Sequence, residues 1–408
     1  MRTLLLSSFL FLLTLLTACT TSSASSVTTA PTIPSLIIPT PPACTAIQVE
    51  PTPGSETPSL FAPASEADHV RGADNPLVTI TEYSDYQDPR SGLFAQVVDQ
   101  LLEEHPNDVR VVSRTFPLIK INDKAALAAQ AAAAAAEQDK FWEMHHLLYA
   151  QQENWISMSV EDFEQWLSAQ ASALGMDVDQ FQSDLKREDI VAKVEEAWES
   201  GQKIGLPGTP LILINGQIYG GPRDYNSLND IVQLIRLGKR QYTSCPPVTV
   251  QQNKQYIATL QTEKGDIVIQ LFADKAPMTV NSFLFLARHG WYDNITFHRV
   301  IPELFAQTGD PSGTGKGNPG YYIITELDPS LTFDKPGMVA MVNSGPDTSG
   351  SQFFITYAPA PQYNGQYTIF GEVLSGMDVL EQLTPRDAQP GADTPPGDQL
   401  IRVTVEEK

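Results

Sequence analysis

The chain has 408 residues, of which 42% are hydrophobic and 18% are charged, and its net charge is −22. This length is too great for one ordinary core and predicts two globular domains with tails. The excess of negative charge excludes nucleic acid as a partner, because it would repel phosphates instead of neutralising them.

Residues 1–19 have the pattern of a signal peptide, with Arg2 followed by an apolar stretch from Leu4 to Leu16. That stretch is shorter than the ~20 residues that a membrane-spanning helix needs. It ends in Leu16-Thr17-Ala18-Cys19, which resembles the lipobox of bacterial lipoproteins and implies that Cys19 carries lipid. An ordinary signal peptide with a cysteine there by chance is the alternative. We therefore expect an extracytoplasmic protein, anchored by lipid to a bacterial membrane at the cell surface or in the periplasm.

Residues 20–63 are rich in Ser, Thr and Pro and carry almost no charge before Glu50, a composition that predicts an extended tether. If Cys19 is lipidated, Cys44 and Cys245 are the two remaining cysteines. Because disulfides persist in exported proteins, we expect a bridge between Cys44 and Cys245 that ties the tether to the inter-domain linker. Two free thiols, or pairing with another chain, are the alternatives.

A first domain is expected at residues 64–242. Its pattern of apolar residues predicts strands at 76–83, 109–114 and 211–214, followed by a hairpin turn at Asn215-Gly216. Helices are expected at 91–105 and 227–237, with a long helical region between the second and third strands that includes the alanine run 131–136. This order of strands and helices predicts an α/β sheet.

A second domain is expected at residues 255–408, after a linker at 243–254. Strands are predicted at 256–262, 266–271, 337–342, 352–356, 368–373 and 401–406, and helices at 277–289 and 377–383. Many short strands separated by Gly and Pro turns predict a closed β-barrel.

Several motifs of the first domain are typical of DsbA-like thioredoxin-fold proteins. They are Val78–Tyr86, Arg114–Leu118, Phe141–His145, Gly208-Thr209-Pro210 and Ile214-Asn215-Gly216. The domain resembles that family, which implies a thioredoxin-like α/β fold with a helical insertion. The resemblance also implies that Pro210 is a cis proline beside the former active site.

The two active-site cysteines of that family are missing. Where Cys-Pro-x-Cys would follow Gln87, this chain has Asp88-Pro89-Arg90-Ser91. Thiol–disulfide exchange needs a thiolate, so we expect the redox function to be lost. We expect Asp88 and Arg90 to form a surface ion pair; a retained groove for extended peptides is the alternative.

The second domain carries a different set of motifs. They are Phe297–Pro302, Gln307 with Gly309-Asp310, Asn343 with Gly345-Pro346, Gly350–Ile355 and Phe370-Gly371. In this order they resemble the cyclophilin-type peptidyl-prolyl cis-trans isomerases over nearly the whole domain. The resemblance implies a mainly-β, eight-stranded barrel capped by two helices, with the active site on one outer face.

The reaction implied by this resemblance is rotation about an Xaa-Pro peptide bond, whose barrier is ~18–20 kcal/mol. It needs no metal and no cofactor, only groups that favour the twisted amide over both planar forms. The resemblance implies three catalytic residues. Arg299 would donate a hydrogen bond to the proline nitrogen, Gln307 would hold the rotating carbonyl region, and Phe354 would form the floor of the proline pocket. A surface ion pair is the alternative for Arg299.

The resemblance implies seven further substrate-binding residues: Leu304, Phe305, Val342, Asn343, Gln352, Tyr363 and Tyr367. Leu304-Phe305 stand where Phe-Met is common in the family, and Val342 stands where a smaller Ala is usual. Gln362-Tyr363 replace the Trp-Leu of the best-known members, and Tyr367 stands where many have His. We therefore expect a pocket of altered shape.

Together these patterns predict a monomeric isomerase that acts on proline-containing polypeptides and assists the folding of exported proteins. The first domain would hold substrate or position the enzyme. A non-catalytic peptide-binding holdase is the main alternative, favoured by the altered pocket residues. A thiol oxidoreductase is a third hypothesis, which the missing cysteines nearly exclude.

Overall fold

The computed structural model describes residues 43–47, 61–251, 253–387 and 395–408. The expected signal peptide, with Cys19, and most of the expected tether lie outside these residues. Within the ranges described, no helix is both long enough and apolar enough to cross a membrane. The domain boundaries expected from the sequence remain predictions.

The N-terminal domain is built on a five-stranded mixed sheet in the order β2-β4-β3-β5-β6. Its central strands β3 and β4 are parallel, and the remaining neighbours are antiparallel. The strands are β2 (His69–Gly72), β3 (Val78–Ser84), β4 (Val109–Thr115), β5 (Leu211–Ile214) and β6 (Gln217–Ile218). The core strands β3 and β4 are almost continuously buried, as expected for strands covered on both faces.

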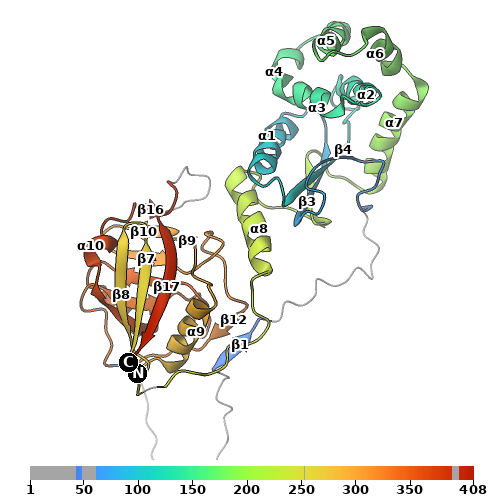
Figure 1. Cartoon of the computed structure of the whole chain (residues 1–408). Helices are drawn as coiled ribbons and strands as arrows, with labels where there is room; N and C mark the ends of the chain where they lie inside the picture. The colour runs from blue at the N-terminus through green and yellow to red at the C-terminus, as the bar shows by residue number, and fades with distance from the viewer. Residues whose placement is uncertain (1–42, 48–60, 252, 388–394) are drawn as a thin grey trace, which may run out of the picture. The chain divides into compact units, whose positions relative to one another are not determined.

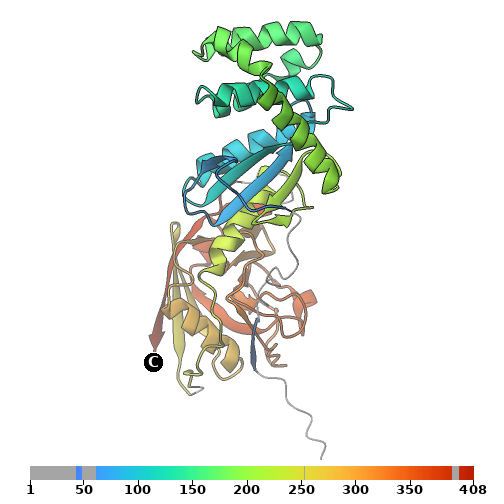
Figure 2. The ribbon, with the colours of Figure 1, turned by 90° about the vertical axis from the view of Figure 1, so that its right-hand side faces the viewer.

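Helices surround this sheet and also form a separate layer. They are α1 (Pro89–Glu104), α2 (Ala125–Ala136), α3 (Phe141–Ala150), α4 (Gln152–Trp155), α5 (Val160–Ala173), α6 (Val178–Leu185), α7 (Glu188–Lys203) and α8 (Tyr225–Gly238). Apolar residues of α1 and α8 share a core with β3, β4 and β5. Helices α2 to α6 gather beyond one end of the sheet (Figures 1 and 2), around a second core in which the alanines of α2 let neighbouring helices approach closely. The domain is therefore α/β, with the helical insertion predicted from the sequence.

The C-terminal domain is an antiparallel β half-barrel with two helices. Its sheet has the order β16-β10-β11-β14-β13-β15-β8-β7-β17-β9. The strands are β7 (Tyr256–Thr262), β8 (Gly265–Leu271), β9 (Ile295–Thr296), β10 (Arg299–Ile301), β11 (Phe305–Thr308), β13 (Met338–Met341), β14 (Phe353–Thr356), β15 (Ile369–Ser375), β16 (Arg386–Asp387) and β17 (Gln399–Glu407). The sheet has ten strands where eight were expected, because two-residue strands, β9 and β16, extend its two ends.

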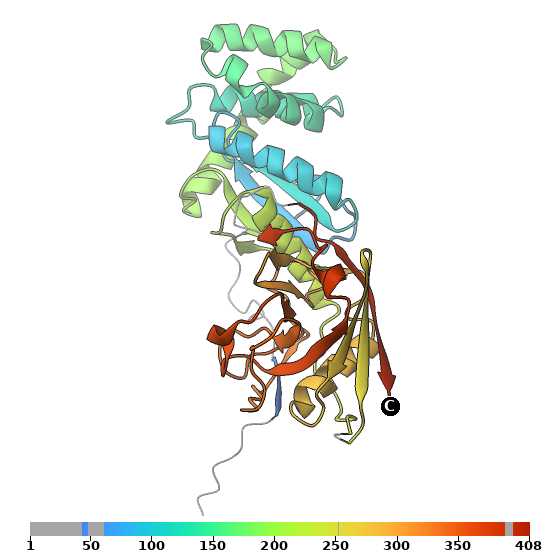
Figure 3. The same cartoon turned by 90° about the vertical axis from the view of Figure 1, so that its left-hand side faces the viewer.

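The inner face of this sheet holds the main core of the domain. Strand β7 alternates buried and half-buried residues, as a strand with one covered face should. Helix α9 (Pro277–Arg288) lies next to β17 (Figures 1 and 3) and buries Phe283, Leu284 and Leu286 in the same core. The second helix, α10 (Met377–Leu380), is shorter than predicted.

A short strand lies within the stretch that was expected to be an extended tether. Strand β1 (Cys44–Ala46) pairs antiparallel with β12 (Tyr321–Ile323) of the C-terminal domain. A disulfide joins Cys44 to Cys245, with a Cα–Cα distance of 6.0 Å and a sequence separation of 201 residues. The bridge expected between Cys44 and Cys245 is thus present, and together with the edge of β12 it holds these residues in place.

Candidate active site

The three candidate catalytic residues lie in one row across neighbouring strands. Arg299 on β10 is directly opposite Gln307 on β11, and Gln307 is directly opposite Phe354 on β14. Residues that face one another in an antiparallel sheet project to the same side. The register therefore brings a cation, an amide and an aromatic ring together on the outer face of the half-barrel.

Phe354 lies at the centre of an aromatic cluster on this face. Its ring centroid is 5.5 Å from that of Phe305, 5.9 Å from Phe333, 5.8 Å from Tyr363 and 5.3 Å from Tyr367. The predicted residues Leu304 and Val342 are partly buried against the same cluster. The cluster forms an apolar, aromatic surface of the kind that proline rings pack against.

The neighbouring residue Phe353 belongs to the inner core instead. It therefore faces away from Phe354, as the alternation of side chains along a strand requires.

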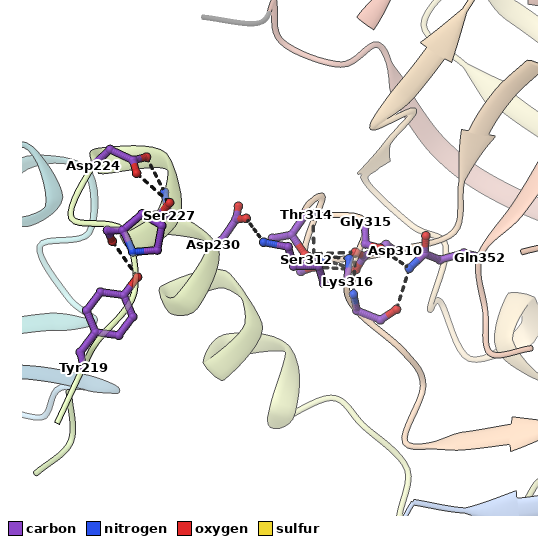
Figure 4. A network of polar contacts seen from close by, with 12 residues as sticks. Tyr219, Asp224, Ser227, Asp230, Asp310, Ser312, Thr314, Gly315, Lys316 and Gln352 are labelled. Atoms are coloured by element: carbon purple, nitrogen blue, oxygen red, sulfur yellow. Dashed lines mark hydrogen bonds and ion pairs between the residues drawn. The ribbon is translucent and has the colours of Figure 1, made fainter. Parts of the chain in front are cut away.

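Gln307 is held by a chain of side-chain and backbone hydrogen bonds. Its amide nitrogen donates to Oε1 of Gln352 at 2.9 Å. The Gln352 amide in turn donates to the carbonyl oxygens of Gly315 and Gly317, at 3.0 and 2.9 Å (Figure 4). Gln307 and Gln352 are both only 9% exposed, so these bonds fix their orientation.

The turn that follows β11 is held by a buried carboxylate. Asp310 accepts hydrogen bonds from the backbone nitrogens of Ser312 and Gly317 and from the hydroxyl of Ser312 (Figure 4). Gly309, just before it, has a φ of +97°, and a Cβ there would lie 2.3 Å from the carbonyl oxygen of Ser351. Only glycine fits this close approach, which holds the end of β11 against the start of β14.

Arg299 is exposed at the edge of this face. Its Nε donates to Oδ1 of Asp387 on β16 at 2.7 Å. Its guanidinium carbon lies 5.2 Å from the centre of the Phe305 ring. The surface ion pair considered for Arg299 is thus present, and it occupies only the Nε donor of the guanidinium.

Asn343 and Tyr367 lie at the far side of the aromatic cluster. The Asn343 side-chain amide donates to the carbonyl oxygen of Gln366 at 3.0 Å, and its oxygen accepts from the backbone nitrogen of Gly345 at 3.2 Å. These bonds tie the loop after β13 to the loop that carries Tyr367. Tyr367 also lines a cavity of about 420 Å³, together with Leu331 and Ile369.

His298, which precedes Arg299 in the chain, is buried, and among the described residues neither of its ring nitrogens has a hydrogen-bond partner. Burial lowers the pKa of His298 to about 4, although the nearby Asp310 acts to raise it. The imidazole is therefore neutral at pH 7 and has a packing role.

In the N-terminal domain, Asp88 stands where the resemblance to DsbA-like proteins implied the first cysteine. It is the N-cap of α1, and Pro89 follows at the first helical position. Its Oδ2 accepts hydrogen bonds from Oγ of Ser91 at 3.2 Å and Oγ1 of Thr209 at 2.8 Å. The Thr209–Pro210 peptide bond is cis.

Asp88 also pairs with Arg90 at 3.2 Å, as the sequence suggested, but the carboxylate is buried and not on the surface. The reason is that Thr209 and Ser91 lie against it and supply its hydrogen bonds.

Two features of these sites were missed from the sequence. Asp387 was overlooked because it is far from Arg299 in the sequence, and only the pairing of β16 with β10 brings the two together. Phe333, which stacks on Phe354, lies in a loop with no repeating pattern. Across the part of the chain that the structure describes, no group of three His, Cys, Asp or Glu side chains could hold a metal ion.

Comparison with known proteins gives a separate match for each domain. A family model described as cyclophilin type peptidyl-prolyl cis-trans isomerase matches residues 257–405, and a thioredoxin model matches residues 64–233. A solved cyclophilin-type isomerase of Cryptosporidium parvum aligns with 35% identity and a TM-score of 0.34, over 38% of this chain and 98% of its own.

Curated relatives match the C-terminal domain at higher identity. Peptidyl-prolyl cis-trans isomerase-like 2 of Cryptococcus neoformans is 41% identical, over 38% of this chain but only 28% of its own length. A peptidyl-prolyl cis-trans isomerase of Arabidopsis thaliana is 46% identical, over 36% of this chain and 94% of its own. Peptidyl-prolyl cis-trans isomerase A of Mycobacterium tuberculosis is 43% identical, over 37% of this chain and 92% of its own. Through its C-terminal domain, the chain therefore belongs to the cyclophilin family of peptidyl-prolyl cis-trans isomerases.

Proposed function

We propose that this protein catalyses cis–trans isomerisation of Xaa-Pro bonds in exported polypeptides. The observation that carries the proposal is the row formed by Arg299, Gln307 and Phe354 on one face of the sheet. A proline ring on Phe354 would lie within reach of both the guanidinium and the amide. Membership of the cyclophilin family supports the same reaction.

The chemistry requires no covalent step. Conjugation in the planar amide delocalises the nitrogen lone pair, and twisting the bond restores it. A hydrogen bond from Arg299 to that nitrogen is strong only in the twisted state, so it lowers the barrier without stabilising either planar isomer. The guanidinium stays charged at every accessible pH. Gln307 would fix the carbonyl side of the bond, and the aromatic floor would keep the proline ring still while the carbonyl side rotates.

The test is the rate of cis-to-trans isomerisation of a short Xaa-Pro peptide by the full chain purified in detergent. Removing one preorganised donor typically lowers turnover by about 10²-fold or more, so we expect Arg299→Ala to lose most of the acceleration. Arg402→Ala, at an exposed arginine on β17, is the matched control and should act like the parent. Equal rates for the parent and Arg299→Ala would refute the assignment of this residue.

The alternative function is a holdase that binds proline-containing segments without turnover. The packing of Leu304, Val342 and Tyr363 around the floor favours it, because these side chains differ from those usual in the family. Binding of the peptide with no acceleration by the parent chain is the result that this alternative predicts.

For the thioredoxin-like domain we propose a redox-inactive module that holds client polypeptides beside Pro210. Asp88 supports the loss of redox function, since a buried carboxylate now receives the hydrogen bonds of Thr209 and Ser91. Carboxylate and hydroxyl groups cannot exchange with a disulfide.

A photo-crosslinking residue at Arg90, which is exposed beside this site, tests the holding role. It should capture an unfolded client, whereas the same probe at Lys186 on the helical insertion should not. Equal capture at both positions, or none at Arg90, would count against the holding role.

The proposed location is the outer side of a bacterial membrane, with Cys19 as the lipid-bearing residue. The signal-like segment and the Leu16-Thr17-Ala18-Cys19 motif support it. We expect the parent chain to fractionate with membranes and Cys19→Ser to lose the lipid. Membrane fractionation that does not change in Cys19→Ser would refute the lipid anchor.

A further inference from the structure

We propose that Asp387 and Phe305 are positioning residues that clamp the Arg299 guanidinium over the proline pocket. The proposal rests on the catalytic role proposed for Arg299 and adds how this chain aims the side chain. It assigns a role to Asp387, which belongs to none of the motifs of the domain.

The first half of the clamp is set by strand register. Asp387 is directly opposite Arg299 in the β16–β10 pair, so the two side chains project from the same face. The Nε–Oδ1 distance is 2.7 Å. Arginine has five N–H donors, one on Nε and four on the two Nη atoms. Within the described ranges, the Nη atoms of Arg299 have no hydrogen-bond partner, so they are free to meet a substrate.

The second half of the clamp is the Phe305 ring. The guanidinium carbon is 5.2 Å from its centroid, within the ~6 Å range of a cation–π contact. The ring cannot move freely, because it is buried and lies 5.5 Å from Phe354. Phe305 thus connects the cation directly to the floor of the pocket, which a flexible methionine at this position would do less rigidly.

Each contact alone is weak, but together they restrict different motions. The hydrogen bond to Asp387 fixes the position of the Arg299 Nε atom relative to β16. The Phe305 ring limits the orientation of the guanidinium plane. An exposed arginine otherwise samples many rotamers. Restricting it before substrate arrives reduces the entropy lost in reaching the twisted-amide geometry. The clamp should therefore act on turnover and not on binding.

The kinetic test compares Asp387→Asn and Asp387→Glu in the full chain with an Ala-Ala-Pro-Phe peptide. We expect Asp387→Asn to lower kcat by about fivefold, the upper range for an exposed ion pair, with KM changed by less than about twofold. Asp387→Glu keeps the charge and should recover part of the loss. Asp293→Asn, which removes the partner of Arg402 on β17, is the matched control and should have no effect. A rise in kcat for Asp387→Asn, or no change, would overturn the proposal.

A second measurement needs no catalysis and therefore separates this proposal from the proposed function. In the parent chain, the ¹H–¹⁵N signal of Arg299 Nε should be shifted and slow to exchange with water. Asp387→Asn and Phe305→Leu should each move it, with the fold unchanged by circular dichroism. An Nε signal that is the same in the parent and both variants would overturn the clamp, whether or not the chain is an isomerase.

Discussion

Glu82 is a buried acidic residue near the thioredoxin-like site. It is buried in β3, where its Oε1 accepts a hydrogen bond from Ser113 at 3.3 Å and lies 4.0 Å from Nε2 of His145. Burial raises the pKa of Glu82 to about 7, against the lowering effect of the Ser113 hydrogen bond. Burial also lowers the pKa of His145 to about 3. The contact is therefore between a neutral imidazole and a carboxyl group that is uncharged below neutral pH.

This environment predicts a pH-dependent stability for the N-terminal domain. Below pH 4.5 the Glu82 carboxyl is protonated in both the folded and the unfolded state, so burying it costs no ionisation free energy and the domain has its full stability. As pH rises from 4.5 through about 7, the unfolded chain ionises first, and about 3 kcal/mol of stability is lost. Glu82→Gln should remove this loss. In urea unfolding, the free energy of unfolding of the variant should therefore rise relative to that of the parent between pH 5 and pH 8. Parallel pH profiles for the two proteins would contradict the argument.

At the residue scale, local motifs named Arg299, Gln307 and Phe354 as candidates, and the strand register places Gln307 opposite both of the others. Their catalytic roles remain predictions. Asp387 lies 88 residues from Arg299, and the burial of Asp88 depends on Thr209, 121 residues away. Such contacts are created by sheet register and by the packing of distant loops, which no local pattern encodes.

Helix α9 begins without a capping side chain of its own. Its N-cap residue is Ala276, and Pro277 occupies the first helical position. Glu326 supplies the missing acceptors. Its two carboxylate oxygens accept hydrogen bonds from the backbone nitrogens of Met278 and Thr279, at 3.0 and 2.8 Å. A carboxylate at this end also complements the helix dipole.

Glu326→Ala should therefore destabilise the C-terminal domain by about 1–2 kcal/mol, the usual cost of losing a cap. Glu326→Gln, which keeps one acceptor oxygen, should lose less. Denaturant unfolding of both variants measures the difference. If the two variants lose the same free energy, or neither loses any, Glu326 does not act as the cap.

Strand β1 is too short to be stable by itself. It pairs three residues with β12, and the backbone nitrogens of Ile47 and Ile324 bond to Gly320 and Ala43 across the pair. An isolated two-stranded pair is marginal in water, so we attribute its persistence to the Cys44–Cys245 bridge, which keeps β1 close to its partner.

In a Cys44→Ser/Cys245→Ser double variant, the amides of Ile47 and Ile324 should lose their protection from hydrogen exchange. Amides in the β7–β8 pair should keep theirs and serve as the internal control. Continued protection of Ile47 and Ile324 would mean that β1 holds its place without the bridge.

At the scale of elements, patterns of apolar residues predicted the long strands and the helices α1, α8 and α9 to within a few residues. The six helices between β4 and β5 were predicted only as one helical region. The strand at Tyr256–Thr262 was predicted with the bounds that the structure gives, because it alternates cleanly. The short strands β1, β2, β9, β10, β11, β12 and β16 were missed. Each has only two to four residues, which is too short for an alternating pattern to stand out in the sequence.

For the whole molecule, composition and length were enough to predict two domains, and the motifs were enough to assign each fold. The two matches do not overlap in sequence, with thioredoxin at 64–233 and cyclophilin at 257–405. The chain thus combines an N-terminal thioredoxin-like domain with a C-terminal cyclophilin domain, on which Arg299, Gln307 and Phe354 form the row proposed to be catalytic. The central claim is that this row of residues catalyses the isomerisation of Xaa-Pro bonds and does not merely bind proline-containing peptides.

The most direct test is two-dimensional NMR exchange spectroscopy of a short Xaa-Pro peptide at equilibrium with a catalytic amount of the full chain. Uncatalysed isomerisation takes tens to hundreds of seconds, so exchange peaks between the cis and trans forms appear only with catalysis. We predict such peaks with the parent chain and their loss with Arg299→Ala. Shifted or broadened peptide signals without exchange peaks would contradict the claim and identify a peptide-binding protein on a cyclophilin fold.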